Sequence, residues 1–122
     1  MEEIGNPRNM NLYKRSLLYS KLVLDWTMDN REEIGEKEFM RIRKMAVGIP
    51  KNIAKAIVDI NIKDKYKKLN QAKDTFLKLT DKLQELGMDG SENGLDGLSL
   101  ELLKLFNGYF GYLAQKKKIN SR

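Results

Sequence analysis

Apolar side chains recur every three or four residues along much of this chain, and that spacing places them on one face of an α-helix. The clearest stretch covers residues 37–60, where the apolar positions are Phe39, Ile42, Met45, Ala46, Ile49, Ile53, Ala56, Ile57 and Ile60. No stretch alternates apolar and polar residues in the two-residue period of a β-strand. The sequence therefore predicts an all-α protein.

Pro50 lies near the middle of that stretch, two residues after Gly48. A proline inside a helix lacks a backbone donor and crowds the carbonyl group of the residue four positions earlier, here Ala46, at a cost of about 3 kcal/mol. The apolar spacing nevertheless keeps the same phase on both sides of Pro50, whereas a loop would normally reset it. We therefore expect one helix that is bent at Pro50 rather than two helices.

The same spacing predicts three further helices, over residues 9–29, 62–86 and 98–118. A chain of 122 residues has room for one hydrophobic core. We therefore expect a single domain over residues 1–122, folded as an antiparallel up-down four-helix bundle. Its core should cover about residues 9–115, with flexible N-terminal and C-terminal tails.

Polar and glycine-containing segments mark where these helices begin and end. Asn9 or Asn11 suits the N-cap of the first helix, and Asn61 is a cap or a connector before the third. Gly87 ends the third helix and opens the glycine-rich connection of residues 87–97. The residues between the first two helices, "NREEIGEK", are expected to form an ordinary connection.

The connection at residues 87–97 contains half of a calcium-loop pattern. Asp89, Ser91 and Asn93 stand where an EF-hand places its first three ligands, followed by Gly94. The twelfth position, which requires a bidentate Glu, is Leu100. The pattern favours an acidic turn over a calcium site, and we expect no metal.

The composition removes most catalytic chemistry, because the chain has no cysteine and no histidine. Thiolate nucleophiles, the usual zinc sites and the commonest general base near neutral pH are therefore absent. The closest group of carboxylates is Glu32, Glu33 and Glu36, in an expected connector. We expect a protein that is not an enzyme and needs no cofactor.

The hydropathy pattern also bears on location. No apolar run approaches the roughly 18 residues of a membrane span. The N-terminus "MEEIGNPRNMN" does not resemble a signal peptide. A cytoplasmic protein that does not enter a membrane is the expectation.

The formal net charge is +6, and the basic excess lies in the middle of the chain. Projected at about 100° per residue, five cations of the second helix fall within about 80° of one another, with Gly48 at their centre. We call these the basic stripe: Lys37, Arg41, Lys44, Lys51 and Lys55. Arg43 is a sixth candidate contact on the same helix. Like charges at this spacing repel by a few tenths of a kcal/mol per pair, and a polyanion would relieve that repulsion.

Two other interpretations of the basic stripe stay open. The first is an ordinary solvated helix face, partly neutralised by Glu33, Glu36 or Glu38. The second is a contact with a protein partner or another subunit. No aromatic residue interrupts the stripe, which favours phosphate contacts over base stacking. The tyrosines and Trp26 fall mostly on predicted seams, where packing is the simpler role.

The apolar faces of the first and fourth helices are wider than one buried stripe requires, which indicates burial against another subunit. Together these features predict a homo-oligomeric nucleic-acid-binding protein without catalytic activity. The alternative is a protein-interaction adaptor, such as an accessory subunit of a polymerase or ribonucleoprotein. The sequence does not specify which nucleic acid or partner is bound.

The segment "IRKMAVGIPKNIAKA", residues 42–56, resembles a run in a known family. The family comprises small bacterial four-helix-bundle proteins encoded in intervening sequences of large-subunit ribosomal RNA genes, related to the accessory variability proteins of diversity-generating retroelements. The matching positions are Arg43, Val47, Ile49, Pro50, Asn52, Ile53 and Ala54. The opening helix "LYKRSLLYSKLVLDWT" is similar to that of the family, and "QAKDTFLKL" at residues 71–79 lies where the family has an Ala-x-Gly-Ser-x-x-Glu-Leu segment.

This chain also departs from the family pattern, and the departures make it more basic. Lysines stand at two positions where the family has Glu. The departing residues are Gly48, Lys55, Ala56, Asp74, Thr75 and Lys78. The resemblance implies a four-helix protomer that assembles into a ring-like homopentamer with a basic surface, for which RNA or DNA binding has been proposed.

Overall fold

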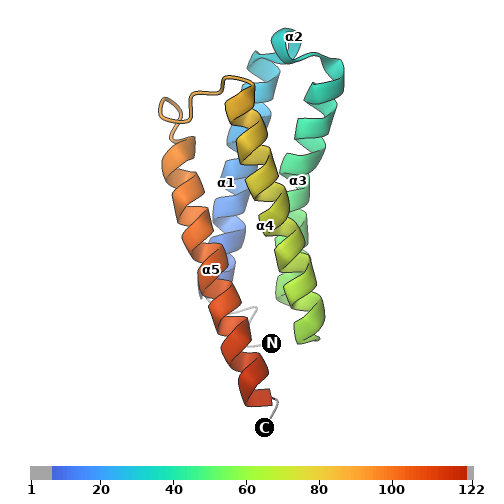
Figure 1. The fold of residues 1–122 in the computed structure, drawn as a ribbon, viewed down its shortest axis with the longest axis vertical. Helices are drawn as coiled ribbons and strands as arrows, with labels where there is room; N and C mark the ends of the chain where they lie inside the picture. The colour runs from blue at the N-terminus through green and yellow to red at the C-terminus, as the bar shows by residue number, and fades with distance from the viewer. Residues whose placement is uncertain (1–6, 121–122) are drawn as a thin grey trace.

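The structure, a computed structural model, describes residues 7–120, and the side chains of residues 10–117. This part of the chain is helical and contains no strand, so the all-α prediction is confirmed. Four long helices lie alongside one another, and each runs back along the one before it (Figure 1). The helices are α1 Pro7–Asp29, α2 Arg31–Ile34, α3 Glu36–Val58, α4 Ile62–Glu85 and α5 Leu95–Asn120.

Several boundaries differ from the predictions, most of them by one or two residues. The expected connection after α1 contains the short helix α2. In this helix the backbone amide of Ile34 donates a hydrogen bond to the carbonyl oxygen of Asn30, at 3.0 Å. α5 begins at Leu95, three residues before the expected start. α1 begins at Pro7, so Asn9 and Asn11 lie inside the helix and neither is its N-cap residue. Proline suits a first helical position because the missing donor would have no partner there.

The core is built from the inward faces of the four long helices. Tyr19, Phe76 and Phe106 pack together at its centre, with ring centroids 5.1 Å apart for Tyr19 and Phe76 and 5.8 Å for Phe76 and Phe106. The Tyr19 hydroxyl is hydrogen bonded to Thr80 at 2.9 Å.

Of the apolar positions predicted in residues 37–60, most are buried and Met45 is partly buried. Ile60 is the exception: α3 ends at Val58, before this residue, and Ile60 is 95% exposed, so its predicted place on the buried face is wrong.

α3 is one uninterrupted helix with Pro50 inside it, and the Pro50 side chain is buried. The constant apolar phase across Pro50 therefore correctly indicated a single helix. The bend at Pro50 stays a prediction.

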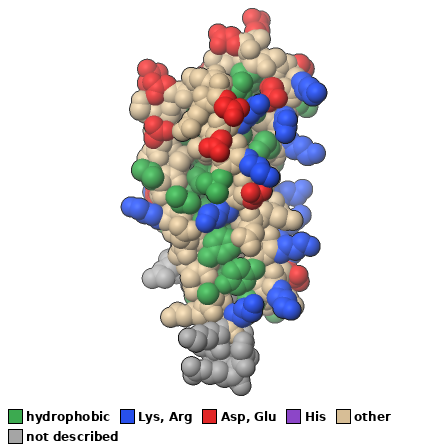
Figure 2. Space-filling view, viewed as in Figure 1, with side chains coloured by type: hydrophobic (Ala, Val, Ile, Leu, Met, Phe, Trp, Pro, Cys, Tyr) green, Lys and Arg blue, Asp and Glu red, His purple; other side chains and the backbone are tan. Residues whose placement is uncertain are grey.

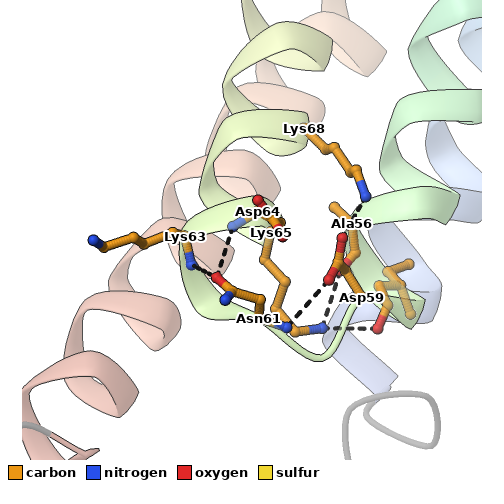
Figure 3. Close-up of polar contacts among 8 residues, drawn as sticks. Ala56, Asp59, Asn61, Lys63, Asp64, Lys65 and Lys68 are labelled. Atoms are coloured by element: carbon orange, nitrogen blue, oxygen red, sulfur yellow. Dashed lines mark hydrogen bonds and ion pairs between the residues drawn. The ribbon is translucent and has the colours of Figure 1, made fainter.

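The corner between α3 and α4 is held by polar contacts (Figure 3). The Asn61 side chain accepts hydrogen bonds from the backbone amides of Lys63 at 2.9 Å and Asp64 at 3.3 Å, so Asn61 is the N-cap of α4. Lys65, only 2% exposed, donates from Nζ to the carbonyl oxygens of Ala56 at 3.0 Å and Ile57 at 2.9 Å. The ammonium group thereby satisfies carbonyls that the last turn of α3 leaves without helical partners.

α4 ends at a left-handed glycine, as predicted. Gly87 has φ +87°, and the amide of Met88 donates to the Leu83 carbonyl at 3.0 Å. This is the Schellman arrangement, which favours glycine because a β-carbon is strained at positive φ.

Candidate nucleic-acid interface

The basic stripe occupies the exposed side of α3. Because the buried residues of this helix define one face, the helical period places all five cations on the opposite side, and each is exposed. Lys and Arg side chains gather along the edge of the molecule where α3 and α4 lie (Figure 2). Acidic side chains gather at the end that carries α2 and the connection before α5.

A surface hollow lies within the stripe, centred on Gly48. A β-carbon built on Gly48 would find no atom within 4 Å, so the missing side chain leaves open space between the cations. The residues that line the hollow are Met40, Arg41, Arg43, Lys44, Val47, Gly48, Lys51, Asn52 and Lys55. Five of the six predicted contact residues therefore border one concavity, and Lys37 lies one turn beyond it.

The acidic residues at the start of α3 form their ion pairs elsewhere. Glu36 pairs with Arg31 at 2.8 Å, and this hydrogen-bonded partner holds the pKa of the Glu36 carboxyl below its usual value. Glu38 reaches across to Lys82 of α4 at 3.6 Å. Within residues 10–117, none of the five stripe cations has an ion-pair partner. Glu36 and Glu38 therefore do not neutralise the basic stripe, although the sequence had left that open.

Arg43 differs from the other five candidates because its guanidinium turns toward α1. Nη1 donates to the Leu24 carbonyl and to Thr27 Oγ1, both at 3.2 Å, and the guanidinium carbon lies 5.0 Å from the centre of the Phe39 ring. Arg43 is half-buried and joins α3 to α1 while bordering the hollow. On the helical projection Arg43 falls outside the basic stripe, and this position was the sign in the sequence that Arg43 could contact another helix.

Sequence reasoning missed the apolar edge of the hollow. Met40 is 60% exposed and Val47 is 51% exposed, and both line it beside the cations. They stand seven residues apart, outside the buried phase of α3, and that spacing could have revealed them.

The tyrosines take packing roles rather than positions at the hollow. Tyr19 and Tyr109 are buried, and the Tyr66 hydroxyl donates to the Phe110 carbonyl at 3.3 Å. No tyrosine or tryptophan lines the hollow. The surface can therefore offer charge and shape to a ligand, but no aromatic stacking platform.

The described residues contain no group of three or more acidic side chains placed to hold a metal ion. Among the helices of residues 7–120, none combines the length and apolar character needed to cross a membrane.

Comparisons with protein-family models, with curated proteins and with solved structures found no match to this chain. The family resemblance of residues 42–56 therefore stays a prediction.

Proposed function

We propose that this protein is a homo-oligomeric nucleic-acid-binding protein without catalytic activity, which contacts phosphates through the basic stripe of α3. In this proposal the four long helices form an antiparallel up-down four-helix bundle, and α3 is the helix that faces the nucleic acid. The observation that carries the proposal is the set of five exposed cations on one side of α3, which have no ion-pair partner among the described side chains. Four of the five border the open space at Gly48.

The spacing of the stripe suits a phosphate backbone. Most successive cations stand about one helical turn apart, roughly 5 Å, whereas Lys44 and Lys51 stand about two turns apart on either side of Gly48. From Lys37 to Lys55 the stripe spans about 27 Å along the helix axis. Each phosphate bound would release condensed counterions and relieve the repulsion between neighbouring cations. Because the proposed mode has no aromatic platform and relies on phosphate contacts, it has little sequence preference.

Assembly would strengthen a contact of this kind. The proposal takes the ring-like homopentamer from the family resemblance of residues 42–56. Several copies of the basic stripe on one assembly would convert a weak single-site contact into a multivalent one.

Charge reversal tests the proposal. The variant Lys44→Glu, Lys51→Glu and Lys55→Glu should lose at least about tenfold in affinity for a dye-labelled RNA hairpin of about 20 base pairs, because three phosphate contacts become repulsive. A matched control reverses Lys14, Lys21 and Lys104, which are exposed on α1 and α5, and so changes the net charge equally. The control should retain most of the affinity in the same fluorescence anisotropy titration.

Salt dependence is the second arm of this test. Five phosphate contacts predict that affinity falls by about 10² to 10³ between roughly 50 and 200 mM salt. A DNA duplex of the same length distinguishes RNA from DNA as the preferred ligand. Absence of binding to both, or an equal loss in the two charge-reversed variants, would sink the proposal.

The second candidate function is an adaptor that docks on a protein partner through the same face. The exposure of Met40 and Val47 beside the cations favours it, because apolar side chains at a charged surface suit a protein contact better than a phosphate backbone. A pull-down from nuclease-treated cell extract separates the two functions. Partners that survive nuclease and are lost in Val47→Ser support the adaptor, whereas partners lost on nuclease treatment contradict it.

A further inference from the structure

A second hollow lies between α4 and α5, and it belongs to a different surface from the basic stripe. It has a volume of about 320 Å³ and is lined by the last turns of α4, the connection after it and the first turns of α5. The lining is mostly apolar, and Leu77 and Leu100 at its edge are 43% and 63% exposed. Figure 2 shows apolar side chains gathered on the face that α4 and α5 present.

The charge of this hollow is opposite to that of the whole protein. The chain carries a net charge of +6, yet the ionisable side chains that line the hollow are two aspartates, Asp81 and Asp96. Both are exposed, and neither forms an ion pair with another described side chain. Unpaired carboxylates at the rim of an apolar hollow favour a ligand that is apolar on one side and cationic at its edges.

The shape of the hollow favours a helix over a small molecule. Its lining runs along α4 from Phe76 to Gln84, which is about 12 Å or two helical turns. Its charged and amide side chains, Asp81, Gln84 and Asp96, are all exposed. Of the two half-buried hydroxyl side chains in the lining, those of Thr80 and Ser99, the Thr80 hydroxyl is already hydrogen bonded within the fold. Sites for small molecules usually place a few polar groups inside the cavity to orient the ligand, whereas a groove between two helices accepts the apolar ridge of a third.

We propose that the groove between α4 and α5 is a docking site for a basic amphipathic helix of a partner protein. Leucine-type side chains on one face of that helix fill the space beside Leu77 and Leu100. Lysine or arginine residues that flank this face pair with Asp81 and Asp96. The site is independent of the basic stripe, so nucleic acid and partner could be held at the same time.

A synthetic peptide tests the proposal with the full chain. The probe is a dye-labelled helix of about 14 residues, with Leu at positions i, i+3, i+4 and i+7 and Lys elsewhere. Fluorescence anisotropy should show saturable binding of this peptide. A peptide with the same Leu pattern and Glu in place of Lys should not bind, and neither should a peptide of the same composition without the periodicity.

Groove variants, each with a matched control on α1, test whether the peptide binds in the groove. Leu100→Ser should weaken binding by about fivefold or more, and Leu77→Ser should do the same, because each removes an apolar contact at a residue that the fold leaves partly exposed. The control Leu18→Ser removes a similarly exposed leucine of α1, and should change the affinity by less than about twofold. Asp81→Asn should weaken binding, while Asp25→Asn on α1 should not. Circular dichroism melts of each variant establish that it is folded.

Three results would overturn the proposal. The first is failure of the Leu and Lys peptide to bind. The second is equal weakening by the groove variants and their controls. The third is dissociation of an oligomer of the protein by Leu100→Ser without any peptide, because the groove would then be filled by a second copy of this chain. Loss of RNA binding in the stripe variants leaves this proposal unaffected, so the two proposals fail separately.

Discussion

Lys65 is a charged side chain inside the fold, and its position follows from the helical period. It stands three residues after Ile62 and four before Leu69, so it shares the buried face of α4. Its burial was not predicted, because lysine is almost never fully buried unless it is paired. Its ammonium group is held by the carbonyl oxygens at the end of α3, where a helix also favours positive charge.

Replacing Lys65 by methionine should lower the free energy of unfolding by about 2 kcal/mol, because charge-assisted hydrogen bonds to two buried carbonyls are lost while the apolar stem is kept. The control is Lys67→Met, which alters an exposed residue of the same helix and should have little effect. Urea unfolding followed by circular dichroism measures both. Equal stability of the two variants would contradict the structural role of Lys65.

The ionisation of the Tyr19 phenol makes the stability of the protein depend on pH. Burial raises the pKa of its phenol to about 12 from an ordinary value of 10, an effect that the hydrogen bond to Thr80 partly offsets. The unfolded chain therefore loses this proton at a lower pH than the folded chain does. The stabilising contribution is complete below pH 10 and is lost as the pH rises from 10 toward about 12.

The variant Tyr19→Phe has no phenolic proton, so its free energy of unfolding should not show the decrease at high pH that Tyr19 causes. Between about pH 10 and pH 12, the free energy of unfolding of the natural protein should fall relative to the variant by up to ~1.4 kcal/mol per pH unit. Urea titrations monitored by Trp26 fluorescence at about pH 8 and pH 11 would measure the difference. Tyr13→Phe, on the same helix, is the control for loss of a hydroxyl group. A stability difference that is independent of pH would contradict the assignment.

At the scale of the elements, the long apolar periods predicted the four long helices, whereas short-range hydrogen bonding decided where they begin. α5 starts early because the Asn93 side chain accepts from the Leu95 amide at 3.1 Å, and the Leu98 amide reaches back to the Gly94 carbonyl at 3.2 Å. In the sequence, the glycines around this start indicated a loop. The four residues of α2 are too few for any periodicity to show.

Pro50 gives the prediction at this scale. We expect the natural protein to have a mass in light scattering that is a multiple of its 14.2 kDa protomer. In Pro50→Ala the Ala46 carbonyl would regain its helical donor and the predicted bend of α3 would be lost, so assembly should weaken and the average mass at micromolar concentration should fall. Size exclusion coupled to light scattering measures both masses, and circular dichroism controls for helix content. An unchanged assembly would remove the proposed reason for the proline, and a monomeric natural protein would contradict the expected oligomer.

At the scale of the whole molecule, the surface could be predicted only in part. The basic stripe follows from one helix, because residues of a single helix keep fixed angular positions. The hollow between α4 and α5 depends on how far two helices separate, which no local pattern specifies. The pairing of Glu38 with Lys82 likewise depends on which helices become neighbours, and it engages one of the acids that could otherwise neutralise the first turn of the stripe.

The separation of charge seen in Figure 2 has a consequence for motion in solution. Acids at one end and cations along one side give the protomer a permanent electric dipole moment in addition to its net charge. The field of a nearby polyanion exerts a torque on such a dipole before the two surfaces touch, over distances of about one Debye length, roughly 10 Å at 0.1 M salt. A protomer approaching with its acidic end forward would be turned during the approach, so that productive collisions begin with α3 already facing the polyanion.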